Sequence, residues 1–324
     1  MAVSGFQPDD WGNCISGHFL TFIIPALSGC NLKCSFCVIA QREEISDNIL
    51  GADDYVRFIR GVAHRLPVAA IALQGYEPLL PSALPYTAAI LRTGRELAIP
   101  CSLVTNGVYL RNALPLLAEL GPNRIGISLD AAAPDRHDRL RSVTGAWAAT
   151  VQGIRDAASV FARSGTRLTV ISTLMPRRAA YLHAMPKLLR ELGVRDWVIN
   201  PLLSIGTDCP GRFPGRSQQL LSDCLELQQL AEDEGVHVAI DDEFDLLRPS
   251  LDECGLWQYA ALNVKTLPPD VTISRLLPSG HCSVGVDILS KLPPDAPRWR
   301  PGIDDPARFL RGLMAGNFAI PKAA

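Results

Sequence analysis

An α/β fold organised as a partial parallel barrel is predicted by three features of this sequence. Strand-like apolar runs alternate with segments of helical periodicity, hydrophobic residues make up 48% of the chain and charged residues 20%, and short polar motifs follow the first four strand candidates. Strands that alternate with helices form right-handed β-α-β units with a parallel sheet. Six such units, (β/α)6, enclose an incomplete barrel, and we expect ligands at the carboxyl ends of its strands.

Each unit is predicted from an apolar run followed by an amphipathic segment. The strand candidates are residues 18–25, 68–74, 100–105, 124–130, 167–175 and 196–203. The helix candidates are residues 52–66, 81–97, 109–120, 146–164, 179–192 and 216–235. The polar motifs fall directly after strands, where the chain turns at one edge of a parallel sheet.

The pattern changes after about residue 242, where proline becomes frequent. With 324 residues, the chain suits one large domain and a smaller addition. We therefore expect a lead-in at 1–17, the partial barrel at 18–242 and an irregular C-terminal extension at 243–324. Within that extension, Val271–Ser274 and Val284–Leu289 resemble short strands.

Charge and cysteine content exclude several classes of protein. The formal net charge of −2 argues against a dominant nucleic-acid surface, which needs an excess of Lys and Arg. No run of 18 or more apolar residues suggests a membrane span, and the first ten residues lack the basic start and apolar run of a secretory signal. Nine cysteines, an odd number in a long chain, favour a reducing interior over a disulfide scaffold. We therefore expect a cytoplasmic protein.

A loop with three cysteines follows the first strand. Cys30, Cys34 and Cys37 have the spacing C-x3-C-x2-C. Three thiolates this close can hold three irons of a cubane 4Fe–4S cluster and leave the fourth iron open to a substrate or cofactor. The alternatives are a zinc site or scattered buried thiols, but zinc commonly takes four ligands in paired short spacings, and no second C-x2-C exists in the chain. The spacing favours a cluster, with Phe36 placed to shield it from water.

This cysteine loop and the polar motifs resemble the radical S-adenosylmethionine (SAM) superfamily, over about residues 18 to 205. Within it, the chain is most similar to the branch of molybdenum-cofactor protein A and the peptide-maturing enzymes with SPASM or twitch extensions. The resemblance implies a partial (β/α)6 barrel that binds SAM at the open iron. It also implies reductive cleavage of SAM to methionine and a 5′-deoxyadenosyl radical, which takes a hydrogen atom from the substrate. An external electron donor such as flavodoxin or ferredoxin is implied as a partner.

Two motifs resemble segments that hold SAM in this superfamily. Gly75-Tyr76-Glu77-Pro78 resembles its Gly-Gly-Glu-Pro segment, with Tyr76 in place of the second glycine. The resemblance implies that Glu77 and the neighbouring backbone hold the methionine amine. Thr105-Asn106-Gly107 resembles a motif that approaches the ribose or the carboxylate of SAM. Ordinary turns are the alternative for both segments, because Gly, Pro and Asn-Gly are common turn residues.

The next strands add further cofactor-binding candidates. Ser128-Leu-Asp130 matches the superfamily's Ser-Leu-Asp, and Arg141, four residues after His137, is implied to pair with the SAM carboxylate. For His137 and Asp138, a local hydrogen bond is favoured over a catalytic role. Asn200, at the end of the sixth strand, is either a contact on the adenine and substrate side or a buried amide with satisfied hydrogen bonds.

The remaining cysteines do not predict a second cluster. Cys209, Cys224, Cys254 and Cys282 are widely spaced and form no C-x2-C pair. Relatives in the resembled branch carry cysteine-rich extensions with auxiliary clusters, so residues 243–324 are interpreted as a reduced, twitch-like cap. Cys14 and Cys101 are expected to be buried thiols.

The sequence thus supports two hypotheses. The first is a radical SAM enzyme with one 4Fe–4S cluster that abstracts a hydrogen atom from a small biosynthetic metabolite or a peptide, the metabolite being favoured. An oxidation, an isomerisation or epimerisation, or a group transfer would all fit. The second is a non-catalytic iron–sulfur or zinc protein that uses the cysteine loop structurally. The motifs at Glu77, Asn106 and Ser128 argue against the second, because a structural metal site needs none of them.

Overall fold

A computed structural model of the chain describes residues 17–23, 30–37, 50–175, 177–202, 217–241, 262–265, 271–284 and 297–315. These residues form a ten-stranded sheet in the order β10-β9-β1-β2-β3-β4-β5-β6-β7-β8. All neighbouring strands are parallel except β9 and β10. The strands are β1 (Gly17–Ile23), β2 (Val68–Gln74), β3 (Cys101–Thr105), β4 (Arg124–Ser128), β5 (Arg167–Leu174), β6 (Asp196–Pro201), β7 (His237–Asp241), β8 (Val264–Lys265), β9 (Val271–Leu276) and β10 (Cys282–Val284).

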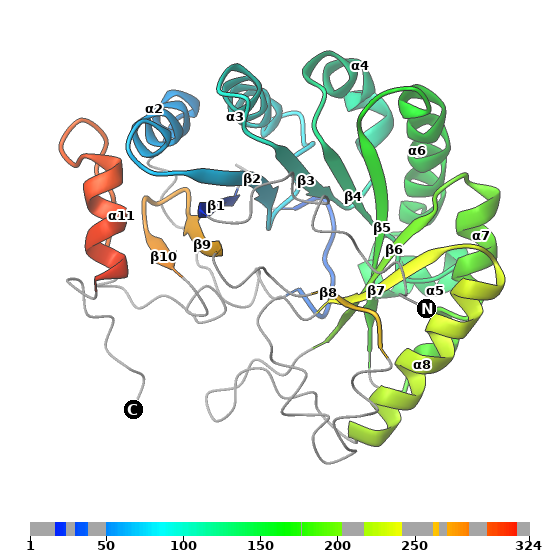
Figure 1. Cartoon of the computed structure of the whole chain (residues 1–324). Coiled ribbons are helices and arrows are strands. Elements are labelled where there is room, and N and C mark those ends of the chain that lie inside the picture. Colours follow the sequence, from blue (N-terminus) through cyan, green and yellow to red (C-terminus); the bar gives the residue numbers. More distant parts are fainter. Residues whose placement is uncertain are drawn as a thin grey trace.

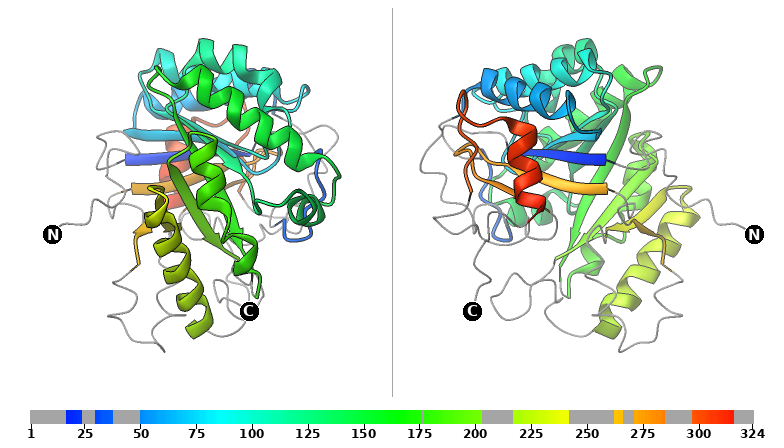
Figure 2. Two further views of the ribbon diagram at one scale, coloured as in Figure 1. Left: turned by 90° about the vertical axis from the view of Figure 1, so that its right-hand side faces the viewer. Right: turned by 60° about the vertical axis from the view of Figure 1, so that its left-hand side comes forward.

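Helices cover the outer side of the curved sheet (Figure 1), and the two views of Figure 2 show the same layering from other directions. They are α2 (Ala52–Ala63), α3 (Leu84–Glu96), α4 (Leu110–Leu120), α5 (Pro134–Arg141), α6 (Ala146–Phe161), the 3₁₀ turn η2 (Ala179–Tyr181), α7 (Met185–Glu191), α8 (Ser217–Asp233) and α11 (Pro306–Met314). The predicted α/β fold with parallel β/α units is therefore confirmed.

The six predicted strands and helices are all present. The second strand has the predicted bounds, and the others differ at their ends, as for the helix predicted at 179–192, which is split between η2 and α7. The chain also forms elements that the sequence did not predict, chiefly the polar helix α5 and the strand β7. Residues 1–16, with Cys14, lie outside the described residues, as do Cys209 and Cys254.

Alternate side chains of each strand point toward the helices and make the core between the two layers. From β1, Phe22 packs edge to face with Tyr55 and Phe58 of α2, at ring-centroid distances of 5.6 and 6.2 Å. The residue before Phe22, Thr21, points to the opposite face of the sheet and is paired in register with Ala72 of β2. The inner face of the barrel thus carries smaller and more polar side chains here than the face beneath the helices.

The described part of the C-terminal extension joins the same sheet. Strand β9 pairs in parallel with β1, and β8 extends the other edge beside β7. Helix α11 packs against α2, and the Trp299 ring lies 5.0 Å from that of Phe58. The strand predicted at Val271–Ser274 is β9, whereas most of Val284–Leu289 lies outside the described residues. That the extension caps the barrel stays a prediction.

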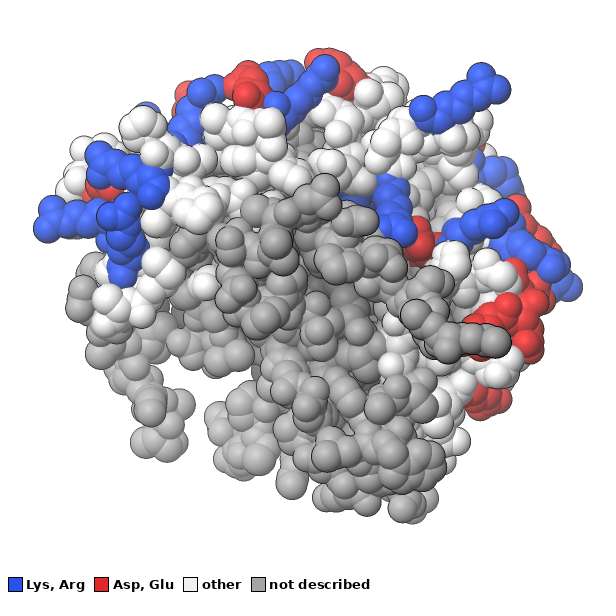
Figure 3. Space-filling view, in the orientation of Figure 1, with Lys and Arg blue, Asp and Glu red and all other residues white. Residues whose placement is uncertain are grey.

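Charged side chains of the face in Figure 3 lie mainly over the outer helices, where basic and acidic groups are mixed. Arg60 of α2 pairs with Glu96 of α3 at 2.5 Å, and Arg65 pairs with Asp305 at 3.1 Å. Basic and acidic side chains therefore alternate along this rim of the described surface.

Gly107 fixes the turn after β3 through its backbone and its lack of a side chain. Its φ is +85°, and a Cβ there would lie 2.6 Å from Thr150 Cγ2. We expect Gly107→Ala to lower the free energy of unfolding by roughly 1–3 kcal/mol, measured in urea, because strain and a clash add. Gly121→Ala is the control, since Gly121 has φ +60° but nothing within 4 Å of its added Cβ. Equal losses of unfolding free energy in Gly107→Ala and Gly121→Ala would contradict a role for close packing at Gly107.

Candidate functional site

Loops from five neighbouring strands meet at the carboxyl edge of the sheet. The cysteine loop follows β1, Gly75–Pro78 follows β2, Asn106 follows β3 and Asp130 follows β4, while Thr173 lies near the end of β5. Side-chain hydrogen bonds connect these segments across 28 to 107 residues of sequence. The predicted clustering of the motifs at one edge is thus what the structure shows.

The cysteine loop presents three free, partly exposed thiols, those of Cys30, Cys34 and Cys37. A turn brings the last two together, since the Cys37 N–H donates to the Cys34 carbonyl at 3.1 Å. Leu32, only 5% exposed, anchors the loop, and the Lys33 N–H donates to the Arg141 carbonyl at 3.2 Å. The loop is therefore attached to the end of α5 through its backbone.

Glu77 is buried, and its carboxylate links the loops after β2 and β3. One oxygen, Oε1, accepts from the Leu79 N–H at 3.0 Å and the Thr105 hydroxyl at 2.6 Å, and Oε2 accepts from the Asn106 N–H at 2.7 Å. Burial raises the pKa of this carboxyl to about 7, against the lowering effect of these donors. Each carboxylate oxygen thus already has a protein donor, and contact with the SAM amine stays a prediction.

Asn106 has every polar group engaged. Its side-chain Oδ1 accepts from the Val108 N–H at 3.0 Å, while Nδ2 donates to Asn31 Oδ1 at 2.8 Å and approaches Cys30 Sγ at 3.6 Å. The Val108 N–H needs an acceptor, which fixes the oxygen end of the amide and directs the NH₂ group at the cysteine loop. Asn31 was not among the predicted site residues, and only its place beside Cys30 could have suggested it.

Arg141 connects a buried carboxylate to a second cysteine. Its Nε and Nη2 donate to Asp130 Oδ2 at 2.7 and 2.6 Å, and Nη1 approaches Cys34 Sγ at 3.6 Å. The guanidinium also lies 5.4 Å from the centre of the Phe36 ring. The predicted residues Asp130 and Arg141 are thus at the site, where they contact each other and the cysteine loop.

Asp130 is itself held from both sides. Its side-chain Oδ1 accepts from the Thr173 N–H at 2.9 Å, and its backbone N–H donates to His137 Nδ1 at 3.1 Å. Burial lowers the pKa of His137 to about 4, so the ring is neutral near pH 7. Asp138 accepts from the backbone N–H groups of Gly145 and Trp147. The local hydrogen bonds favoured for His137 and Asp138 are present.

The other candidates lie at the same edge of the sheet. Gly75 has φ +106° and is exposed, and Tyr76 is half-buried. Ser128 is half-buried at the end of β4, and Asn200 is exposed near the end of β6. Among the described residues, neither Ser128 nor Asn200 donates or accepts a side-chain hydrogen bond with the cysteine loop. Asn200 is therefore not the buried amide that was its alternative.

The thiols fit the predicted iron–sulfur cluster in kind and number, and N–H donors lie near two of the sulfurs. Burial raises the pKa of the Cys30 and Cys34 thiols, so binding a metal would release their protons. Within the described ranges, no group of three His, Cys, Asp or Glu side chains has the arrangement of a metal-ion site. The cluster assignment therefore rests on the kind, number and spacing of the three thiols.

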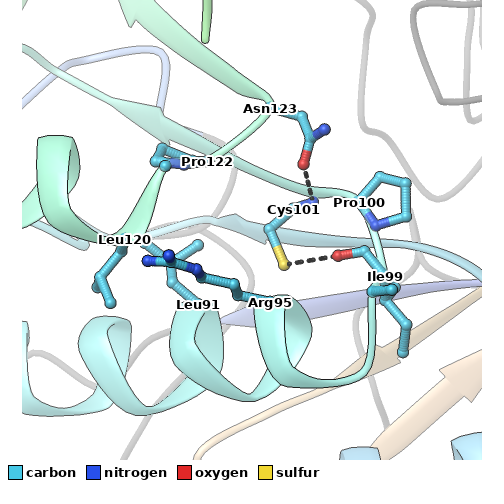
Figure 4. A pocket seen from close by; sticks show the side chains of 10 residues that line it. Leu91, Arg95, Ile99, Pro100, Cys101, Leu120, Pro122 and Asn123 are labelled. Atoms are coloured by element: carbon cyan, nitrogen blue, oxygen red, sulfur yellow. Dashed lines mark hydrogen bonds between the residues drawn. The ribbon is translucent and has the colours of Figure 1, made fainter. Parts of the chain in front are cut away.

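The other three described cysteines are buried. Cys101 borders a cavity of about 250 Å³ at the amino ends of β3 and β4 (Figure 4), donates to the Ile99 carbonyl and has its pKa raised to about 12 by burial. It is therefore an unreactive thiol. Cys224 and Cys282 are also buried. Cys224 lies in α8, which packs against β7, and Cys282 lies in β10 at the far end of the sheet order.

Comparisons with known proteins agree with the site. Residues 24–178 match the model of the radical SAM superfamily. A probable GTP 3′,8-cyclase of Halobacterium salinarum is 34% identical over 158 residues, which are 46% of this chain and 41% of that protein. The AdoMet-dependent heme synthase of Methanosarcina barkeri is 29% identical over 167 residues, covering 51% and 46% of the two chains. This chain thus spans under half the length of these relatives.

Solved structures share the fold at low sequence identity. Streptococcus suis SuiB bound to S-adenosylmethionine aligns with a TM-score of 0.67 and 15% identity, over 95% of this chain and 67% of SuiB. A structure of anSMEcpe with bound AdoMet aligns with a TM-score of 0.52 and 19% identity, over 68% of this chain and 64% of the other. In addition, none of the helices described for this chain is long and apolar enough to cross a membrane.

Proposed function

We propose, from the match of residues 24–178 to the radical SAM superfamily, that the chain is an enzyme that cleaves SAM reductively and abstracts a hydrogen atom from its substrate. The observation that carries the proposal is the triad of free thiols at the carboxyl edge of the sheet, two of which lie beside N–H donors from the loop after β3 and from the end of α5. A purely structural metal loop would not require the connected polar side chains at the ends of β2, β3 and β4.

We assign the cluster to Cys30, Cys34 and Cys37, with the fourth iron left for SAM. When bound, a 4Fe–4S cluster with SAM supplies the electron that splits the cofactor into methionine and a 5′-deoxyadenosyl radical. The chain would position its thiols through Asn106 after β3 and Arg141 at the end of α5, and Phe36, whose ring packs against the Arg141 guanidinium, would shield the cluster from water. Gly75, Ser128 and Asn200 lie at the same edge and are proposed, with Tyr76 beside Glu77, to contact SAM or substrate.

One cluster per chain is the proposed content. The positions of Cys224 and Cys282 support this, because Cys224 lies in α8, which packs against β7, whereas Cys282 lies in β10 at the far end of the sheet order. The electron would then come from a separate donor such as flavodoxin or ferredoxin. All six described cysteines are free thiols, which supports a reducing compartment such as the cytoplasm.

A small metabolite is the proposed substrate class. The relatives at 28–37% identity carry names that refer to GTP and heme, whereas SuiB, crystallised with its precursor peptide SuiA, is 16% identical. The relatives with the higher sequence identity are therefore those whose names refer to small molecules. To distinguish a metabolite from a peptide substrate, the reconstituted enzyme is given either the low-mass fraction or the peptide fraction of a deuterated cell extract, together with SAM and reductant. Deuterium in 5′-deoxyadenosine from the low-mass fraction alone supports a metabolite, and label from the peptide fraction alone would overturn it.

The catalytic proposal is tested by anaerobic reconstitution with iron and sulfide, followed by reductant and SAM. We expect about four irons per chain and formation of 5′-deoxyadenosine. We expect Cys34→Ala to lose most of the bound iron and most of the 5′-deoxyadenosine, because one iron loses its thiolate. Cys224→Ala, which removes a buried thiol on α8, is the matched control and should retain both. Iron bound in the wild type without any 5′-deoxyadenosine would favour the non-catalytic metal-binding hypothesis.

A further inference from the structure

We infer that Asn106 and Arg141 are positioning residues that hold Cys30 and Cys34 before the cluster binds and raise the reduction potential of the bound cluster. Asn106 Nδ2 and Arg141 Nη1 each lie 3.6 Å from one of these sulfurs. The inference rests on the proposed function only for its second half, because the hold on the loop exists without a metal.

The two donors are arranged in the same way, although Asn106 follows β3 and Arg141 ends helix α5. Behind each donor is a buried carboxylate: Glu77 accepts from the Asn106 backbone N–H, and Asp130 accepts from the Arg141 side chain. Glu77 and Asp130 are 2% and 1% exposed. Each carboxylate also accepts a hydrogen bond from the neighbouring strand of the sheet. For Glu77 the donor is the Thr105 hydroxyl of β3, and for Asp130 it is the Thr173 N–H of β5.

Neither donor has another orientation that satisfies its partners. Turning the Asn106 amide would leave the Val108 N–H without its acceptor and set two oxygens against each other at Asn31. At Arg141, Nε and Nη2 are fixed by Asp130, so the planar guanidinium directs Nη1 at Cys34. A lysine has a single charged point and could not span the carboxylate and the sulfur together.

Such donors act on the electronic state of a cluster as well as on its geometry. Hydrogen bonds to the sulfurs are among the factors that set the reduction potential of iron–sulfur clusters. Reduction adds negative charge, which N–H groups aimed at sulfur stabilise, so the potential rises. Residues that resemble SAM-binding motifs therefore have a defined role toward the thiol ligands in this chain.

The reduction potential is tested by following the cluster signal by electron paramagnetic resonance during a redox titration without SAM. Two variants remove the donors: Asn106→Leu, and the double variant Asp130→Asn/Arg141→Gln, which leaves no unpaired carboxylate. In each we expect about a tenfold smaller ratio of reduced to oxidised cluster at a fixed potential, equivalent to a midpoint lower by about 59 mV for one electron.

Matched controls separate this effect from general changes. Arg139→Gln removes a positive charge from an exposed position on the same helix. Asn123→Leu removes, as Asn106→Leu does, an amide oxygen that accepts one backbone N–H, in this case that of Cys101. Both controls should keep the wild-type midpoint. Unchanged midpoints in the donor variants, or equal shifts in the controls, would overturn the role in reduction potential.

Hydrogen exchange of the metal-free chain tests the hold on the loop separately from any cluster. We expect amide protection in residues 30–37 to fall at least several-fold in Asn106→Leu and in Arg141→Lys, and to stay unchanged in both controls. Unchanged protection in the donor variants would overturn the positioning role. If the wild-type chain holds no cluster, the proposed function fails, while this measurement still decides the positioning role.

Discussion

Replacing Asp130 with Asn is expected to lower the free energy of unfolding of the metal-free chain by roughly 3 kcal/mol. The Asp130 side chain is fully buried and that of Arg141 is 9% exposed, so the variant leaves a guanidinium charge in the interior without its carboxylate. Asparagine can still accept from the Thr173 N–H, but its NH₂ group or a weaker neutral oxygen would face Arg141. Urea unfolding monitored by circular dichroism measures the loss.

Two comparisons make this expectation specific to the buried pair. Asp304→Asn breaks an exposed pair with Arg300 four residues earlier, and its effect should be much smaller because water solvates the remaining charge. The double variant Asp130→Asn/Arg141→Met should recover part of the lost stability, because it removes the buried charge as well. Equal losses for Asp130→Asn and Asp304→Asn would show that Asp130 is not part of a buried ion pair.

The predicted fold follows from patterns that are local in sequence. Strand β2, Val68–Gln74, is a short apolar run bounded by Pro67 and Gly75, and its bounds match the prediction. Strand β7, His237–Asp241, was missed because five residues carry too little pattern to distinguish a strand from a loop. Helix α5 was missed because its sequence is almost wholly polar, and only tertiary contacts reveal why it buries residues such as His137 and Arg141.

The candidate site could be predicted in membership but not in its contacts. The assignment of Glu77 and Arg141 to the amine and the carboxylate of SAM stays a prediction, and the sequence did not give the contacts of these side chains with Thr105 and Asp130. Sequence gives the residue type and the strand end, and it does not give the direction of a side chain at a turn. The Arg141 contact with Cys34 joins residues 107 positions apart, a distance at which no local pattern carries information.

Glu77 should make the stability of the metal-free chain depend on pH, in a direction opposite to that of an ordinary surface carboxylate. Burial raises its pKa in the folded chain to about 7, above the 4.5 of a free glutamate. Between these values the folded state keeps a proton that the unfolded state releases. The contribution to stability is therefore complete below about pH 4.5 and is lost as the pH rises through about 7.

Comparing Glu77→Gln with the wild type at pH 6 and pH 8 isolates this contribution. From pH 6 to 8 the wild type should lose about 1.4 kcal/mol more stability in urea than the variant does, because only the wild type must ionise a buried carboxyl. His137, whose pKa is lowered to about 4, contributes a slope of the opposite sign, but equally in both chains, so it cancels in the difference. Parallel pH profiles would mean that Glu77 is already ionised at pH 6, and that the donors from Leu79, Thr105 and Asn106 outweigh its burial.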